Sequence, residues 1–166
     1  MFWIDSGKSA RLKRLFGAQP AAIANITGDE AHSSIKGLVS FHPADSGLLI
    51  VADISGLPYH DGECGGEPLG FHIHEGNRCA GDANDPFALT GGHYDPYDCE
   101  HPYHAGDMPP LFSNNGFAWN AFYTERLSVN DVIGKTVIIH SMRDDFTTQP
   151  SGGSGAKIAC GVINWM

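Results

Sequence analysis

Residues 70–79, GFHIHEGNRC, alternate histidine with apolar residues: His72 and His74 are two positions apart, with Phe71 and Ile73 beside them. Successive side chains of a β-strand point to opposite faces, so both imidazoles should share one face and both apolar side chains the other. An ordinary half-buried strand with a polar outer side explains a His-x-His pair equally well. The pair therefore indicates a metal site only if the rest of the chain supplies further ligands.

Short runs with the composition of β-strands follow one another along most of the chain. Gly, Pro, Asn or Asp separate them, and the 21 glycines and 10 prolines agree with many turns. Runs of this kind predict an all-β sandwich or barrel. They are residues 21–28, 34–42, 47–56, 70–75, 116–123, 134–140 and 156–164.

The 166 residues suit one domain, and 42% hydrophobic residues are enough for one core. We place the domain at residues 21–166. Residues 1–20 have a net charge of +3 and are predicted to be an N-terminal extension, either flexible or a short helix.

Three histidines (His32, His42, His60) are expected at the surface. Trp119 and Trp165 are expected in the core or an interface.

The net charge of −9 argues against a nucleic-acid-binding protein and against a polybasic membrane anchor. No apolar run approaches the roughly 18–20 residues of a membrane span. The N-terminus lacks the order of a signal peptide, so a cytoplasmic location is expected, or export if an upstream segment is missing. The four cysteines form no Cys-x-x-Cys pair, which argues against a thiolate zinc site and leaves disulfides open.

Two connections, residues 75–115 and 141–156, are too long for simple turns, and long loops in a compact β domain are usually functional. The first contains three histidines and an aspartate, namely His93, His101, His104 and Asp107. Three imidazoles and a carboxylate suit a closed, tetrahedral structural zinc site. His72, His74 and His140, which ends the run GKTVIIH, offer imidazoles suited to copper, zinc or iron.

These motifs resemble the copper/zinc superoxide dismutase family, in order and spacing, over about residues 21–164. The matching segments are GFHIHE, GGHYDP, HAGD, GKTVIIH and GAKIACGVI. The resemblance implies a flattened Greek-key β-barrel of about eight strands, with two long functional loops that hold the metals outside it. It implies copper and zinc as cofactors and superoxide as substrate. Because branches of the family dimerise through different surfaces, the resemblance leaves a homodimer open.

The resemblance also implies roles for individual residues. Four histidines match the copper ligands (His72, His74, His93, His140), and His93 is the bridging histidine that also belongs to the zinc set (His93, His101, His104, Asp107). Asp144 matches the aspartate that links a copper histidine to a zinc histidine. Cys79 and Cys160 match the family disulfide.

The chain departs from the family pattern at several positions. The His74-to-Cys79 spacing resembles the bacterial branch, and the spacing between His101 and His104 is shorter than usual. Lys157 stands where the family has an arginine that guides the anion to copper, and lysine lacks the planar fork of arginine. Arg143 is a second candidate for this role, and it is equally well interpreted as a solvated surface residue.

Cys64 and Cys99 are additional to the family pattern; they could pair with each other, stay free or cross-link two chains. Two alternatives compete with an active dismutase. A non-catalytic zinc- or copper-binding homologue would typically lack copper ligands, and all of them are present here. A cupin-type metal enzyme would explain the His-x-His strand but not His101, His104 and Asp107.

Overall fold

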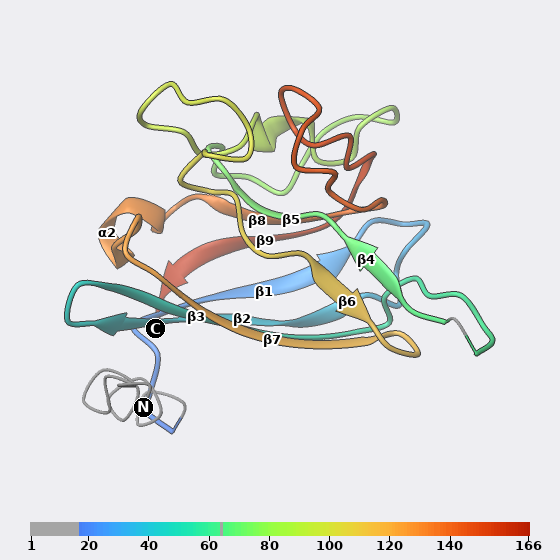
Figure 1. The fold of residues 1–166 in the computed structure, drawn as a ribbon, viewed down its shortest axis with the longest axis horizontal. Coiled ribbons are helices and arrows are strands. Elements are labelled where there is room, and N and C mark those ends of the chain that lie inside the picture. The colour runs from blue at the N-terminus through green and yellow to red at the C-terminus, as the bar shows by residue number, and fades with distance from the viewer. Residues whose placement is uncertain (1–16, 64) are drawn as a thin grey trace, which may run out of the picture.

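The structure is a computed structural model that describes residues 17–63 and 65–166. It consists mainly of β-strands, with two very short helices (Figure 1). The elements are β1(Ala22–Gly28), β2(Lys36–Ala44), β3(Gly47–Ser55), β4(Glu67–Leu69), β5(Phe71–His74), η1(Ala88–Thr90), β6(Leu111–Ser113), β7(Phe117–Thr124), α2(Val129–Val132), β8(Thr136–His140) and β9(Lys157–Trp165). Residues 1–16, most of the predicted extension, lie outside the described residues, so the division at residue 20 stays a prediction.

Seven strands form one antiparallel sheet in the order β5-β8-β9-β1-β2-β3-β7. The sheet curls, so that β5, β8 and β9 lie opposite β2, β3 and β7 (Figure 1). A small sheet of β4 and β6 lies between the two edges, because β4 leads through Gly70 into β5 and β6 turns directly into β7. The predicted all-β barrel-like fold is confirmed, and all seven predicted runs are strands.

The core lies inside this curled sheet. Alternate residues of each strand point into it, among them Val39 and Phe41 of β2, Phe71 and Ile73 of β5, and Val137 of β8, all fully buried. Branched and aromatic side chains at period two favour a pleated strand with one buried face, which is why these segments pair as they do.

The outer face of β5 and β8 is also buried, unlike that of an ordinary half-buried strand. Every residue of both strands is buried. The two long connections, residues 75–110 and 141–156, lie together over this face (Figure 1). A second small apolar cluster of Phe87, Ile138, Cys160 and Cys79 packs between loop and sheet. The loops therefore enclose outward-pointing side chains of these two strands.

The structure differs from the expectations at two points. The short strands β4 and β6 were not predicted, because segments of three residues carry too little pattern. His42 is buried, 5% exposed, and not a surface residue. Trp119 and Trp165 are 55% and 57% exposed, which excludes the core, and the interface stays a prediction. In the described part of the chain, no helix has the length and hydropathy needed to cross a bilayer.

Candidate metal centre

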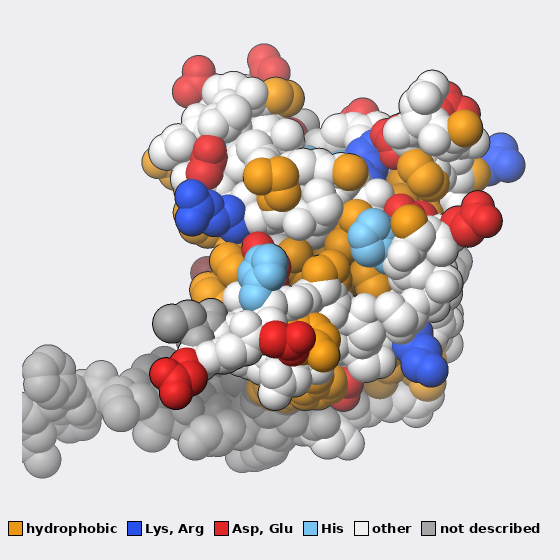
Figure 2. All heavy atoms as spheres, turned by 90° about the vertical axis from the view of Figure 1, so that its right-hand side faces the viewer, with side chains coloured by type: hydrophobic (Ala, Val, Ile, Leu, Met, Phe, Trp, Pro, Cys, Tyr) orange, Lys and Arg blue, Asp and Glu red, His pale blue; other side chains and the backbone are white. Residues whose placement is uncertain are grey.

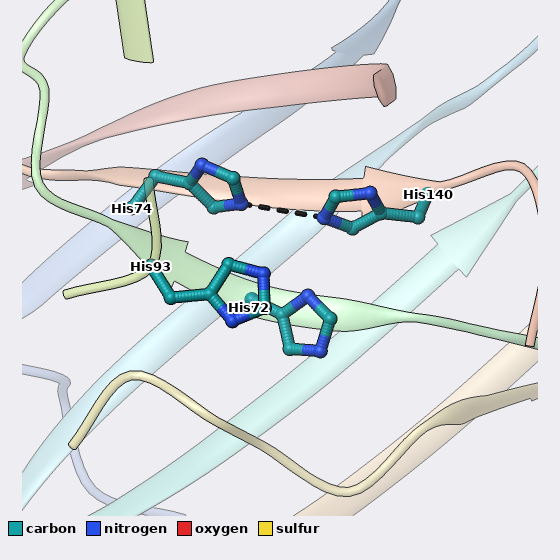
Figure 3. Close-up of side chains that lie close together, drawn as sticks. All are labelled: His72, His74, His93 and His140. Carbon is teal, nitrogen blue, oxygen red and sulfur yellow. Dashed lines mark hydrogen bonds between the residues drawn. The ribbon is translucent and has the colours of Figure 1, made fainter. Parts of the chain in front are cut away.

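Two neighbouring strands bring three histidines to one face. β5 and β8 are antiparallel, and His72 and His74 face outward beside His140 at the end of β8. The Nε2 atoms of His74 and His140 are 3.3 Å apart, and the rings of His72 and His140 have centroids 4.9 Å apart (Figure 3). The alternation of strand side chains thus places all three imidazoles side by side, and residues 70–79 predicted the shared face of His72 and His74.

The first long loop adds a fourth imidazole. His93 forms an isolated bridge with His74, and its ring stacks on that of His72 with centroids 3.9 Å apart (Figure 3). Backbone bonds fix this part of the loop against β5, because Tyr94 donates to the Ile73 carbonyl at 2.8 Å and Ile73 donates to the Gly106 carbonyl at 2.9 Å. This segment of the loop therefore pairs with the edge of β5 as a further strand would.

His93 also belongs to a second group that surrounds the Asp107 carboxylate. The Nδ1 atom of His93 is 2.7 Å from Asp107 Oδ1, and the Nδ1 atoms of His101 and His104 are 3.1 and 3.3 Å from Asp107 Oδ2. All four residues are buried. The short spacing between His101 and His104 does not prevent both side chains from reaching the same carboxylate.

Several of these rings also form a hydrogen bond to a backbone carbonyl. His74 Nδ1 donates to the Gly91 carbonyl at 2.9 Å, and His140 Nδ1 donates to that of Gly155 at 3.3 Å. His104 Nε2 donates to the Cys99 carbonyl at 3.1 Å. A ring nitrogen that donates in this way leaves the other one with a free lone pair, which is the form that binds metals.

Three ring nitrogens of the two groups make no hydrogen bond in the described part of the chain, although one of them, His101 Nδ1, lies 3.1 Å from Asp107 Oδ2. His72 Nδ1, His93 Nε2 and His101 Nδ1 are buried and make no hydrogen bond among the described residues. Buried polar atoms are normally satisfied, so such orphans call for a ligand. In each group the four ligand atoms lie within 4.8 Å of one another; the groups are His72, His74, His93, His140 and His93, His101, His104, Asp107. Both donor sets fit a metal ion.

Asp144 forms hydrogen bonds to one histidine of each group. Its Oδ2 accepts from His72 Nε2 at 2.7 Å, and its Oδ1 accepts from His101 Nε2 at 2.9 Å. Burial would raise the pKa of Asp144, but the hydrogen bonds from His72, the Phe146 amide and His101 outweigh it and hold the pKa well below its usual range. Gly152 packs here at φ +69°, where any Cβ would collide with Asp144 and His101.

Burial also governs the histidines. It lowers the pKa of His140 to about 3, with a further contribution from His72, and it lowers the pKa values of His72 and His74. Burial would raise the pKa of Asp107, but the hydrogen bond and charge of His93, followed by His101 and His104, lower it. At neutral pH the imidazoles of His72, His74 and His140 are therefore neutral and the carboxylates of Asp107 and Asp144 ionised, the protonation states that metal binding requires.

The chain matches a family of known proteins. A family model described as copper/zinc superoxide dismutase matches residues 35–163. The chain belongs to this family. Its cofactors are accordingly copper and zinc, and its activity is that of a superoxide dismutase.

Individual relatives agree with the family match. The chain is 31% identical over 163 residues to a copper–zinc superoxide dismutase of Deinococcus radiodurans, covering 87% of this chain and 85% of that protein. It is 39% identical over 108 residues to the enzyme of Photobacterium leiognathi, covering 57% of this chain and 62% of that protein. The structure of the Cu/Zn superoxide dismutase from Brucella abortus superposes with a TM-score of 0.71 at 26% identity, covering 85% of this chain and 98% of that one.

The disulfide that the family resemblance implies is present. Cys79 and Cys160 are bonded, which ties the first long loop to β9. Cys99 is a free, exposed cysteine. Cys64 lies outside the described residues, so its pairing stays open.

The dismutase site opens into a pocket of about 650 Å³ between the two long loops. His74, His93 and His140 line it together with Lys157. Figure 2 shows two raised parts at the upper end of the molecule, with acidic side chains on both. Lys157 Nζ contacts Asp85 Oδ2 at 3.0 Å and the Phe87 carbonyl at 3.2 Å. Arg143 is exposed and is not among the pocket residues.

Sequence analysis did not single out Asp85, the carbonyls of Gly91 and Gly155, or Gly152. A carbonyl carries no signal in the sequence, because every residue has one. Asp85 is one of many carboxylates in its loop, and only the fold selects it as the partner of Lys157.

Proposed function

We propose that copper is held by His72, His74, His93 and His140, and zinc by His93, His101, His104 and Asp107, in an enzyme that converts two superoxide ions and two protons into oxygen and hydrogen peroxide. Bound copper supplies the two one-electron transfers by alternating between Cu(II) and Cu(I). The observation that carries this division is the position of His93, whose Nδ1 faces Asp107 while its Nε2 is buried beside His72 without a hydrogen-bond partner among the described residues.

The residues of the chain do the remaining work. The carbonyls and Asp144 hold the ring planes, so the ligand atoms need not reorganise when the charge at the site changes. His93 Nε2 is the nitrogen through which a proton can be held next to the reacting oxygen. The zinc set keeps the His93 ring in place, because Asp107 and the loop around it are fixed to the edge of β5.

Lys157 supplies positive charge at the mouth of the site. It begins β9 opposite His140 and lines the same pocket, with a side chain 16% exposed. A cation acts strongly only within about 8–10 Å at physiological salt, so a lysine in the pocket can outweigh carboxylates farther away. Arg143, exposed and outside the pocket lining, is the weaker candidate for this role.

Substitution of ligands tests the assignment. His72→Ala and His140→Ala should abolish dismutation and leave a folded protein that still binds zinc, while Asp107→Ala should weaken zinc binding. Copper and zinc content and the dismutation rate would be measured for each variant. His60→Ala, an exposed histidine paired with Glu67, is the matched control and should behave as wild type. Full activity in either copper-ligand variant would overturn the assignment.

Two further features stay proposals. A homodimer is supported by exposed aromatic side chains such as Trp119 and Phe117, and sedimentation of the metal-loaded protein would test it. The location of the protein, cytoplasmic or exported, stays a prediction. Cell fractionation would test the location. The question matters because an intramolecular disulfide is unusual in a reducing compartment.

A further inference from the structure

Arg126 lies in the connection between β7 and α2, outside both metal-binding groups. Its guanidinium contacts the turn that carries two of the proposed zinc ligands. Nη1 donates to the His104 carbonyl at 2.9 Å and to the Tyr103 carbonyl at 3.4 Å, and Nη2 donates to the Asp107 carbonyl at 2.9 Å. Three carbonyls of one turn, residues 103–107, therefore converge on one side chain.

The turn presents its two sides to different partners. The side chains of His104 and Asp107 face His93, while their carbonyls face Arg126. Bonds within the turn keep its shape, because the His104 amide donates to Asp107 Oδ2 at 3.0 Å and the Asp107 amide donates to the His104 carbonyl at 3.1 Å. These internal bonds do not fix where the turn stands relative to the barrel.

Contacts on two sides fix that position. On the side of β5, the Gly106 carbonyl accepts from the Ile73 amide at 2.9 Å, and the Gly106 amide donates to the Tyr94 carbonyl at 2.8 Å. On the side of β7 and α2, the guanidinium of Arg126 is the contact. Arginine suits this task, because its donors form a rigid planar fork that stays charged at any physiological pH.

We propose that Arg126 is a positioning residue of the zinc site, which holds the turn of His104 and Asp107 at the distance from His93 and His101 that one ion requires. The proposal rests on the zinc assignment given above. Residues that orient metal ligands without touching the metal typically change affinity 10–100-fold when they are replaced. Arg126 is itself exposed, so water can take the place of its guanidinium at the freed carbonyls, and the fold should survive.

The test is zinc affinity in the full chain with its disulfide intact. We expect Arg126→Gln to weaken zinc binding by about 10–100-fold in competition with a chromogenic chelator. The visible absorption of Co²⁺ bound in place of zinc should also change, because it reports tetrahedral geometry. Arg126→Lys should lie between Gln and wild type, since one ammonium cannot reproduce the fork. Urea unfolding of the metal-free variants would show that the change is in binding and not in folding.

Arg78→Gln is the matched control, with the same change in charge at an exposed arginine for which no hydrogen bond or ion pair is found across residues 17–63 and 65–166. It should bind zinc as wild type does. If Asp107→Ala weakened zinc binding and Arg126→Gln did not, the Arg126 proposal would be wrong and the zinc assignment would stand. If Asp107→Ala also bound zinc like wild type, the assignment itself would fail, and the Arg126 proposal with it.

Discussion

At the scale of single residues, Lys157 shows how one side chain can counteract the charge of the whole protein. The net charge of −9 repels an anion on average, and Lys157 lies in the pocket beside His140. Its contact with Asp85 holds the ammonium in place and also offsets part of its charge. Lysine keeps the charge of the family's arginine without the bidentate fork.

We therefore expect Lys157→Glu to lower the second-order rate of dismutation by roughly tenfold or more at low ionic strength, while Lys157→Arg changes it far less. Copper content should stay unchanged, and the salt dependence should change in the Glu variant because a steering charge is reversed. Stopped-flow rates at several salt concentrations would measure this. Lys36→Glu, at an exposed position on β2, is the control. Equal rates for wild type and Lys157→Glu would exclude Lys157 and direct attention to Arg143.

At the scale of elements, the first long loop is held to the sheet at three places. The disulfide joins Cys79 to Cys160 of β9, Phe87 packs on Ile138 of β8, and the segment of His93 pairs with the edge of β5. A loop of this length would otherwise be costly to order, because each residue loses backbone freedom. Attachment at these points places the ligands of the loop over those of the strands.

Replacing both cysteines, Cys79→Ser with Cys160→Ser, should lower the free energy of unfolding by about 4 kcal/mol, the usual size for a closed loop of this length. Urea titration of the metal-free proteins would measure the difference. Cys99→Ser, at the exposed free cysteine, should leave stability unchanged. Peptide mapping of the wild-type protein that recovered Cys79 linked to Cys99 or Cys64 would contradict the pairing.

At the scale of the whole molecule, the buried imidazoles and carboxylates couple folding to pH. Burial lowers the pKa of His140 to about 3 and those of His72 and His74 below their usual value, so an unfolded chain takes up these protons at a higher pH than the folded one does. The pKa of Asp144 is also lower in the folded protein. Both effects stabilise the fold above the ordinary pKa values and are lost as the pH falls.

We expect the stability of the metal-free protein to decrease from about pH 6.5 downward, as unfolded histidines become protonated, and to continue falling below about pH 4 as unfolded aspartates do. The effect of His140 is on the order of a few kcal/mol. Urea midpoints between pH 7 and pH 4 would measure it. The slope should be smaller for His140→Gln, which lacks one of these groups, and a flat profile in the wild type would show that burial does not set these pKa values.

The sequence alone determined much of the fold and of the candidate site. Period-two runs such as residues 34–42 identified the strands, because a half-buried strand has apolar residues at alternate positions. The ligand types and their resemblance to a family identified the two metal groups, since imidazole and carboxylate are chemically suited to metals wherever they stand.

The tertiary structure decided what depends on contacts between distant segments. His42 is buried, although it was expected at the surface, because the packing of the strands sets exposure. Asp85 meets Lys157, and Arg126 meets the turn of His104, through segments far apart in the chain. Hydrogen bonds to backbone carbonyls leave no pattern in a sequence, since every residue carries the same acceptor, and only the fold selects which of them a side chain reaches.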